Sequence, residues 1–198
     1  DVDDLLQDLQ PVAEEAKAFT LFGKAYSRLD DGARELLIRA SIFEEAVPEE
    51  ALRWMMGDEK TPSPPVSKPL EELQRWGLVA RQDEREIRLF SVHTLVRQFV
   101  QKEAENNGAD LRPLRIRAAQ HYELQVKVNH DLWDHLRARD YYYRAGEYER
   151  AAGIVEAAWK YLARWGFIEL AMRLLQQSAD TTSGATKARA NGNLAILY

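Results

Sequence analysis

The chain of 198 residues has four side chains that change protonation near neutral pH: His93, His121, His130 and His135. An imidazole can move a proton, ligate a metal or contact a phosphate. The segment 130–135 combines two of these histidines with two aspartates, but their spacing matches no established metal-binding motif. A helix N-terminal cap is the simpler interpretation of this segment. We therefore expect no metal site.

Other catalytic signatures are missing from the sequence. The chain has no cysteine, which excludes a disulfide scaffold, a cysteine-ligated metal and a cysteine nucleophile. It contains no Gly-x-Ser-x-Gly and no His-Glu-x-x-His motif. The phosphate-binding pattern Gly-x-x-x-x-Gly-Lys-Ser/Thr is also missing. These observations predict a chain that is not an enzyme and has no catalytic residue.

His93 lies where a predicted strand gives way to a predicted helix. An imidazole donor at a helix N-terminus suits a phosphate, and it equally suits a capping histidine packed under a neighbouring hairpin. Both interpretations stay open for the residues alone. Arg97 follows one helical turn later and can assist with an anion, pair with Glu103 or face solvent.

His93 and Arg97 lie in the first half of the chain, where apolar periodicity predicts both helices and strands. It predicts helices followed by two strands that alternate polar and apolar residues, joined by a turn at 83–85. This order is typical of a winged helix, with a hairpin that must pack on the helices to be stable. A further helix follows. The predicted elements are helices 12–29, 32–43, 47–56 and 68–76, strands 78–82 and 86–90, and helix 92–106.

The second half reads as helices only, at 111–129, 131–144, 147–164, 167–177 and from 193. Gly146 and Gly166 each precede a large residue and then an alanine at the same offsets, Ala151 and Ala171. Such repetition is typical of tetratricopeptide-like helical repeats, and the last helix reads as the start of a truncated repeat. We expect an N-terminal helical linker (1–27), a winged-helix domain (28–108) and helical repeats (109–198).

Net charge argues against nucleic-acid binding. The chain carries −5 overall, with −8 in residues 1–109 and +3 in 110–198. In a winged helix the third helix reads DNA, but here Lys68 and Arg75 are balanced by Glu71 and Glu72. These charges make DNA binding the less favoured interpretation, and a DNA-binding transcription regulator with a partner-binding repeat arm is kept as the alternative function. No apolar run is long enough to span a membrane, and the expected location is the cytoplasm.

Three consecutive tyrosines, Tyr141, Tyr142 and Tyr143, fall in one predicted helix of the repeats. Three neighbours on a helix cannot all face its buried side, so at least one is expected near the surface. Tyrosine is a frequent recognition residue at interfaces. We expect these tyrosines to contribute to a surface that binds a partner, although packing between helices accounts for most of the aromatic residues in the repeats.

The first half resembles the winged-helix domain of STAND-type signalling ATPases, which include the NB-ARC proteins. The resemblance rests on Tyr-Ser-Arg-Leu-Asp at 26–30, Ala-Arg-Glu-Leu-Leu at 33–37, Leu-Glu-Glu-Leu at 70–73 and Phe-Ser-Val-His-Thr-Leu-Val-Arg at 90–97. The last segment is similar to the MHD-like motif of that family, with Val92 in place of methionine and Thr94 in place of aspartate. As an architecture the resemblance covers residues 20–198.

The resemblance implies a role for His93. In that family the motif histidine contacts the phosphates of ADP held by a nucleotide-binding domain, which this chain lacks. Carried over, His93 would touch an ADP phosphate in a longer parent protein that binds ADP or ATP. The winged helix would dock on that domain, and the repeats would bind a small ligand or a protein partner. The expected function is thus a non-catalytic regulatory and sensor segment.

Overall fold

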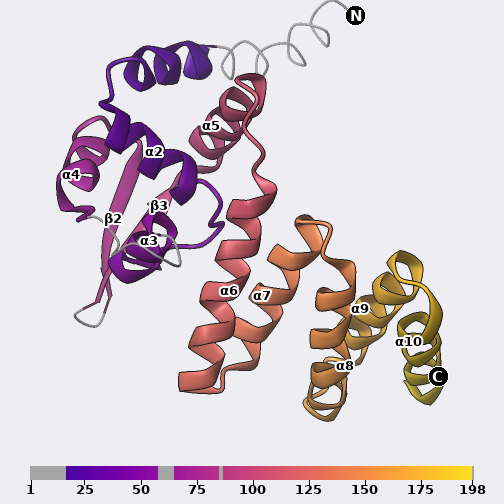
Figure 1. The fold of residues 1–198 in the computed structure, drawn as a ribbon. Helices are drawn as coiled ribbons and strands as arrows, with labels where there is room; N and C mark the ends of the chain where they lie inside the picture. Colours follow the sequence, from indigo (N-terminus) through magenta and orange to yellow (C-terminus); the bar gives the residue numbers. More distant parts are fainter. Residues whose placement is uncertain (1–16, 58–64, 85–86, 198) are drawn as a thin grey trace, which may run out of the picture. The chain divides into compact units, whose positions relative to one another are not determined.

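A computed structural model describes residues 17–57, 65–84 and 87–197. The chain divides into two compact units, Asp1–Asp110 and Leu111–Tyr198. Helices dominate, and a small three-stranded sheet lies in the first unit (Figure 1). The mainly helical class predicted from the sequence is confirmed.

The first unit combines helices and strands. Helical residues 17–26 come first, and their aromatic side chains pack on Phe99, with Tyr26 edge-on at 6.0 Å between ring centroids. This segment, expected to be a linker, is therefore attached to the helix that ends the unit. The elements that follow are α2 (Asp31–Ala40), β1 (Val47–Pro48), α3 (Glu49–Met56), α4 (Ser67–Arg75), β2 (Val79–Glu84), β3 (Ile87–Val92) and α5 (Thr94–Asn106).

Helix α2 shows why the sequence folds as it does. The Asp30 carboxylate accepts a hydrogen bond from the Ala33 N–H at 2.7 Å and so caps the helix. One face of α2 is buried, with Leu36 and Leu37 fully inaccessible to solvent. This face contacts α3, α4 and α5. The apolar spacing that predicted the helix thus forms the centre of the first unit's core.

The sheet has the order β1-β3-β2, and both pairs of strands are antiparallel. The predicted hairpin is confirmed, but Asp83 and Glu84 belong to β2 instead of to the turn, because Glu84 pairs with Ile87. The rest of the connection, 85–86, lies outside the described residues, as do residues 12–16 of the first predicted helix. Val47 and Pro48, expected to begin a helix, form a third strand before α3.

The second unit contains five helices in the described residues. Successive helices contact each other, and α10 also contacts α8. The helices follow one another through short turns (Figure 1). Helix α9 runs four residues beyond its predicted end, and α10 begins nine residues earlier than predicted. The helices are α6 (Arg112–Asn129), α7 (Leu132–Arg144), α8 (Tyr148–Arg164), α9 (Ile168–Thr181) and α10 (Gly184–Leu197).

The two predicted joints have the same geometry. Gly146 and Gly166 follow α7 and α8 with φ values of 76° and 88°, a left-handed conformation that favours glycine. After each glycine, a backbone N–H donates to the carbonyl five residues earlier, at 2.9 Å and 2.8 Å. This pattern satisfies carbonyls that the helix end leaves unpaired. Ala151 and Ala171, at equal offsets, are both buried.

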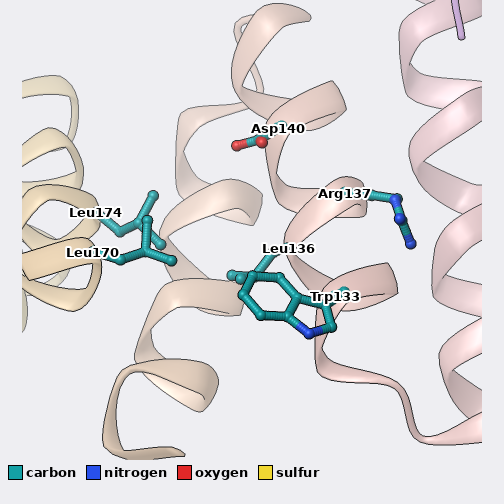
Figure 2. A pocket seen from close by; sticks show the side chains of 6 residues that line it. All are labelled: Trp133, Leu136, Arg137, Asp140, Leu170 and Leu174. Atoms are coloured by element: carbon teal, nitrogen blue, oxygen red, sulfur yellow. The ribbon is translucent and has the colours of Figure 1, made fainter. Parts of the chain in front are cut away.

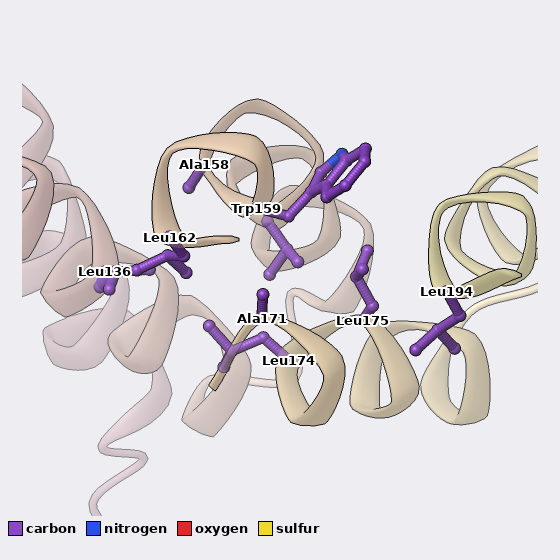
Figure 3. Close-up of a cluster of buried hydrophobic side chains, with 9 residues drawn as sticks. Leu136, Ala158, Trp159, Leu162, Ala171, Leu174, Leu175 and Leu194 are labelled. Carbon is purple, nitrogen blue, oxygen red and sulfur yellow. The ribbon is translucent and has the colours of Figure 1, made fainter. Parts of the chain in front are cut away.

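A buried apolar cluster connects four helices of the second unit (Figure 3). Leu136 comes from α7, Leu162 from α8, Leu175 from α9 and Leu194 from α10. Trp159 is buried in the same cluster. Burial of this apolar surface is what stabilises the stacked helices, since no single helix can bury its apolar face alone.

Gly192 offers a test of helix propensity in α10. It lies inside the helix, and a Cβ built there meets no atom within 4 Å. We expect Gly192→Ala to raise the free energy of unfolding by about 0.5–1 kcal/mol, because alanine loses less backbone entropy on folding. The matched control is Gly146→Ala, which forces alanine into a positive φ and should destabilise the chain by about 1 kcal/mol. Urea denaturation measures both, and a shift of the same sign for both variants would contradict this account.

Candidate functional site

His93 is the N-terminal cap of α5. Its Nδ1 accepts a hydrogen bond from the Leu95 N–H at 3.3 Å, and the side chain is exposed. A neutral ring that accepts at Nδ1 carries its proton on Nε2. His93 is therefore a capping histidine, as one interpretation of the sequence expected. It is not packed under the hairpin, and its second nitrogen can donate to a group outside the first unit.

Arg97, one turn later, has a structural task. Its guanidinium donates to the Phe43 carbonyl at 3.2 Å, and Gln101 donates to the Ser41 carbonyl at 2.6 Å. These two bonds tie α5 to the segment that follows α2. None of the three roles considered for Arg97 from the sequence describes this contact. Arg97 therefore has a structural contact within the first unit, and an anion site shared with His93 stays a prediction.

The three tyrosines are separated by burial. Tyr141 is 4% and Tyr142 2% exposed, whereas Tyr143 is half-buried. Tyr141 stacks on Tyr122 of α6 with ring centroids 5.8 Å apart, and Tyr143 meets Tyr148 edge-on. Tyr141 and Tyr142 are therefore packed between helices, and the part of the three tyrosines in a partner surface stays a prediction. The rings of Tyr141 and Tyr142 fill the contacts of α7 with its neighbours, and only Tyr143 is left partly accessible.

An apolar pocket of about 240 Å³ opens between α7 and α9 (Figure 2). Leu136, Leu170 and Leu174 line its apolar side, and the Trp133 indole forms a wall. Asp140 adds a carboxylate at the rim. Small-molecule and side-chain sites commonly combine an apolar lining with few polar groups. This pocket is the candidate binding site of the second unit.

Arg137 also lines the pocket, but its charge is engaged elsewhere. Its guanidinium donates to Asp134 at 2.7 Å and lies 5.8 Å from the centroid of the Tyr122 ring. Figure 2 shows the side chain running away from the leucines. Only its aliphatic stem therefore borders the pocket, which leaves Asp140 as the polar group at this edge.

A buried arginine, Arg139, pairs with Asp140 of this pocket. Arg139 is 4% exposed and donates to Asp140 and to Gln177 of α9, both at 2.8 Å. Its guanidinium carbon lies 4.5 Å from the Tyr143 ring centroid. The Nε has no hydrogen-bond partner among the described residues. Arg139 therefore joins α7 to α9 and holds the Asp140 carboxylate in place at the pocket rim.

Aromatic side chains extend the apolar surface beyond the pocket. Trp133 is 43% exposed and meets Phe167 edge-on, with 5.4 Å between ring centroids. Ile168, next in the chain, is also exposed. Adjacent exposed apolar side chains of this kind are typical of surfaces that bind a ligand or a protein.

The segment 130–135 shows no metal-binding arrangement. The Asp131 carboxylate caps α7 by accepting from the Trp133 N–H at 2.9 Å. Asp134 accepts from Asn129 and from Arg137, both at 2.7 Å. Across the ranges that the structure describes, no three acidic or histidine side chains gather as metal ligands. Within the same ranges no helix is long and apolar enough to cross a bilayer.

Charged side chains of α4 and of the hairpin are partly engaged within the first unit. Arg81 forms an ion pair with Asp83 on the same strand at 2.9 Å. Glu72 of α4 accepts from the Asp30 N–H at 3.4 Å, while Lys68, Glu71 and Arg75 are exposed. The exposed face of α4 therefore carries both signs of charge, as the sequence indicated.

A search of solved structures connects this fold to a signalling protein. The crystal structure of a Signal Transduction ATPase with Numerous Domains (STAND) protein with a tetratricopeptide repeat sensor, from Pyrococcus horikoshii, matches with a TM-score of 0.62 at 23% identity. The chain resembles part of that STAND protein. The match covers 90% of this chain and 25% of the other. No family model and no curated protein matches the sequence.

The similarity to the STAND protein concerns the fold, because 23% of residues are identical. It extends through most of both units, and it agrees with the expected combination of a STAND-type architecture with tetratricopeptide-like repeats. The pocket between α7 and α9 was not anticipated. The apolar periodicity of 131–144 and 167–177 indicates which helix faces are buried. A pocket between the two helices depends on how they pack, and they are separated in the sequence by a third helix.

Proposed function

We propose that the chain is a regulatory and sensing segment of a STAND-type signalling protein. The observation that carries this proposal is the fold similarity to the STAND protein over 90% of the chain. The chain spans about a quarter of that protein, so the activity of a longer parent belongs to the proposal as well. The segment itself transmits a signal and performs no reaction.

The first unit is proposed to be a winged helix. The order of its elements, α2-β1-α3-α4-β2-β3, supports this assignment. So does the sheet, in which β1 pairs with β3. In this role the unit works as a rigid body that docks on a nucleotide-binding domain supplied by the parent protein. Its docking contact is His93, whose exposed Nε2 donates to a phosphate of ADP.

The second unit is proposed to be the sensor. Its apolar pocket between α7 and α9, with the neighbouring Trp133 and Phe167, takes an apolar group of a ligand or protein partner. Binding there favours one of two arrangements of the parent protein and releases the docked first unit. A ligand shifts such an equilibrium only by its difference in affinity for the two states.

The His93 contact is tested in the natural protein that contains these 198 residues. We expect His93→Asn to speed ADP release about tenfold, because one hydrogen bond to a charged phosphate is lost. Asparagine is a strong N-cap, so this variant keeps the helix start and the stability. His93→Ala should show the same release rate and also lose about 1 kcal/mol of stability with the cap. Stopped-flow release of a fluorescent ADP analogue and urea denaturation measure the two effects.

Two results would contradict the proposal. Unchanged ADP release in His93→Asn would leave His93 as a cap alone. Salt-sensitive, micromolar binding of the chain to mixed duplex DNA, lost in Arg75→Ala, would favour the DNA-binding alternative instead.

A further inference from the structure

A second hollow in the repeat unit is polar, in contrast to the apolar pocket. It has a volume of about 520 Å³ and is formed by one face each of α6, α7 and α8. Each helix contributes side chains one or two turns apart, so their orientation follows from helix geometry. The lining residues are Gln120, Glu123, His135, Tyr142, Arg150, Gly153 and Ile154.

One acidic and one basic side chain face this hollow from opposite helices. The Tyr142 hydroxyl donates to Glu123 Oε2 at 2.9 Å, which fixes the carboxylate on one side. The Arg150 guanidinium lies 5.5 Å from the Tyr142 ring centroid, on the side of α8. The phenol thus meets a negative group, Glu123, and a positive group, Arg150, whose charge and hydrogen bonding act to lower the pKa of Tyr142. Burial and the hydrogen bond to Glu123 raise the pKa of Tyr142 to about 12, so the phenol stays neutral.

Arg150 is only loosely engaged by its acidic neighbour. Glu147 accepts from Arg112 at 2.8 Å through one oxygen, and its other oxygen lies 4.0 Å from Arg150 Nε. That second distance is too long for a hydrogen bond. The Arg150 side chain is 57% exposed, so its donors can reach a molecule in the hollow.

Neutral hydrogen-bonding groups complete the lining. Burial lowers the pKa of His135, so this imidazole is neutral at pH 7 and offers one donor and one acceptor. Gln120 adds an amide on the same face of α6 as Glu123. Ile154 supplies an apolar wall. The lining therefore has no net charge and carries one negative side chain on α6 and one positive side chain on α8.

Gly153 keeps the wall of the hollow open. It lies inside α8, where glycine is unfavourable, and a Cβ built there meets no atom within 4 Å. Close packing between helices therefore does not explain the glycine. Any larger side chain at this position would project toward the space that the polar groups surround.

We propose that this hollow binds a small zwitterion of the class of free α-amino acids, with its ammonium group on Glu123 and its carboxylate on Arg150. The assignment rests on the proposed sensing role of the repeats and adds a ligand class to it. A phosphate or dicarboxylate would meet the Glu123 carboxylate, and a lone amine would meet the Arg150 guanidinium. A molecule with one charge of each sign satisfies both groups, and Ile154 can contact its side chain.

The test uses thermal unfolding of the 198-residue chain with each standard amino acid at 10 mM, except tyrosine, which is used as a saturated solution. We expect at least one of them to raise the Tm by about 4 °C or more, as a Kd near 100 µM would produce. Glu123→Gln and Arg150→Gln should each reduce that shift to less than about 1 °C, since each removes one charge of the site. Arg173→Gln, at an exposed position of α9, is the matched control and should keep the full shift.

Two further variants separate binding from folding. Gly153→Ala should keep the shift, because a methyl group fits the open space, whereas Gly153→Met should abolish it by filling the hollow. The inference would be overturned if no amino acid raised the Tm, or if Glu123→Gln and Arg150→Gln kept the full shift of the unchanged chain. An equal effect of 10 mM methylammonium acetate would overturn it too. This test needs neither ADP nor His93, so its failure would leave the proposed docking role standing, and failure of the His93 test would leave an observed amino-acid site standing.

Discussion

Leu162→Ala is expected to lower the free energy of unfolding of the repeat unit by about 3–4 kcal/mol. Leu162 is 0% exposed and lies in the cluster that joins α7, α8, α9 and α10. Truncation removes buried apolar surface and leaves a cavity that neighbours from four helices cannot easily close. Urea denaturation followed by far-UV circular dichroism measures the loss.

Tyr161→Ala provides the matched control on the same helix. Tyr161 is 55% exposed and adjacent to Leu162, so its loss should change the stability by no more than about 0.5 kcal/mol. If the two variants lost similar amounts, the cluster shown in Figure 3 would not be the main source of stability in this unit.

Arg139→Ala is expected to lower the free energy of unfolding by about 2–4 kcal/mol. Arginine at this position packs its aliphatic stem inside the unit and donates to Asp140 and Gln177. Alanine removes those bonds, the contact with the Tyr143 ring and the packed stem together. Because Arg139 joins α7 to α9, the variant should also weaken any binding at the pocket between those helices.

Arg139→Met separates the stem from the charge. Methionine retains most of the packed volume and removes a buried cation whose Nε has no partner among the described residues. Asp140 is half exposed and can be hydrated once the arginine is gone. We therefore expect the free energy of unfolding of Arg139→Met to lie within about 1 kcal/mol of that of the unchanged protein. A loss as large as that of Arg139→Ala would show that the charged contacts, and not the stem, connect the two helices.

The repeat helices were predictable because their ends carry strong local signals. Gly146 and Gly166 adopt the positive φ values that only glycine takes easily, so both joints were visible in the sequence. The end of α9 was not predicted correctly from the sequence. Ser178, Thr181 and Thr182 look like loop residues, but each hydroxyl donates to the backbone carbonyl four residues earlier. Polar side chains satisfied in this way let the helix continue through a buried region.

The strand β1 was missed for a different reason. Two residues, Val47 and Pro48, are too short to show any alternation, and proline next to two glutamates is typical of a helix start. The strand exists because Val47 pairs with Phe90 of β3, far away in the chain. Local sequence patterns do not contain that information, whereas they did contain the β2–β3 hairpin.

The candidate sites divide in the same manner. His93 was identified from its position between a strand and a helix, and the structure places it at that junction as a cap. Tyr141 stacks on Tyr122 of α6, and Tyr142 meets Glu123 of α6 and Arg150 of α8, so the tyrosine triplet alone did not reveal which ring stays accessible. The polar hollow depends on Glu123, Tyr142 and Arg150, which come from three helices. Each looks like an ordinary surface residue until those helices are packed.

The strand order β1-β3-β2 leaves β1 and β2 at the two margins of the sheet. On the β2 side, residues from Ala80 to Glu84 are exposed and include Arg81, Asp83 and Glu84. On the β1 side, Pro48 has no N–H to offer to an incoming strand. Charge on one margin and proline on the other oppose the addition of strands from further copies. Both margins of this small sheet therefore carry features that disfavour pairing with another strand.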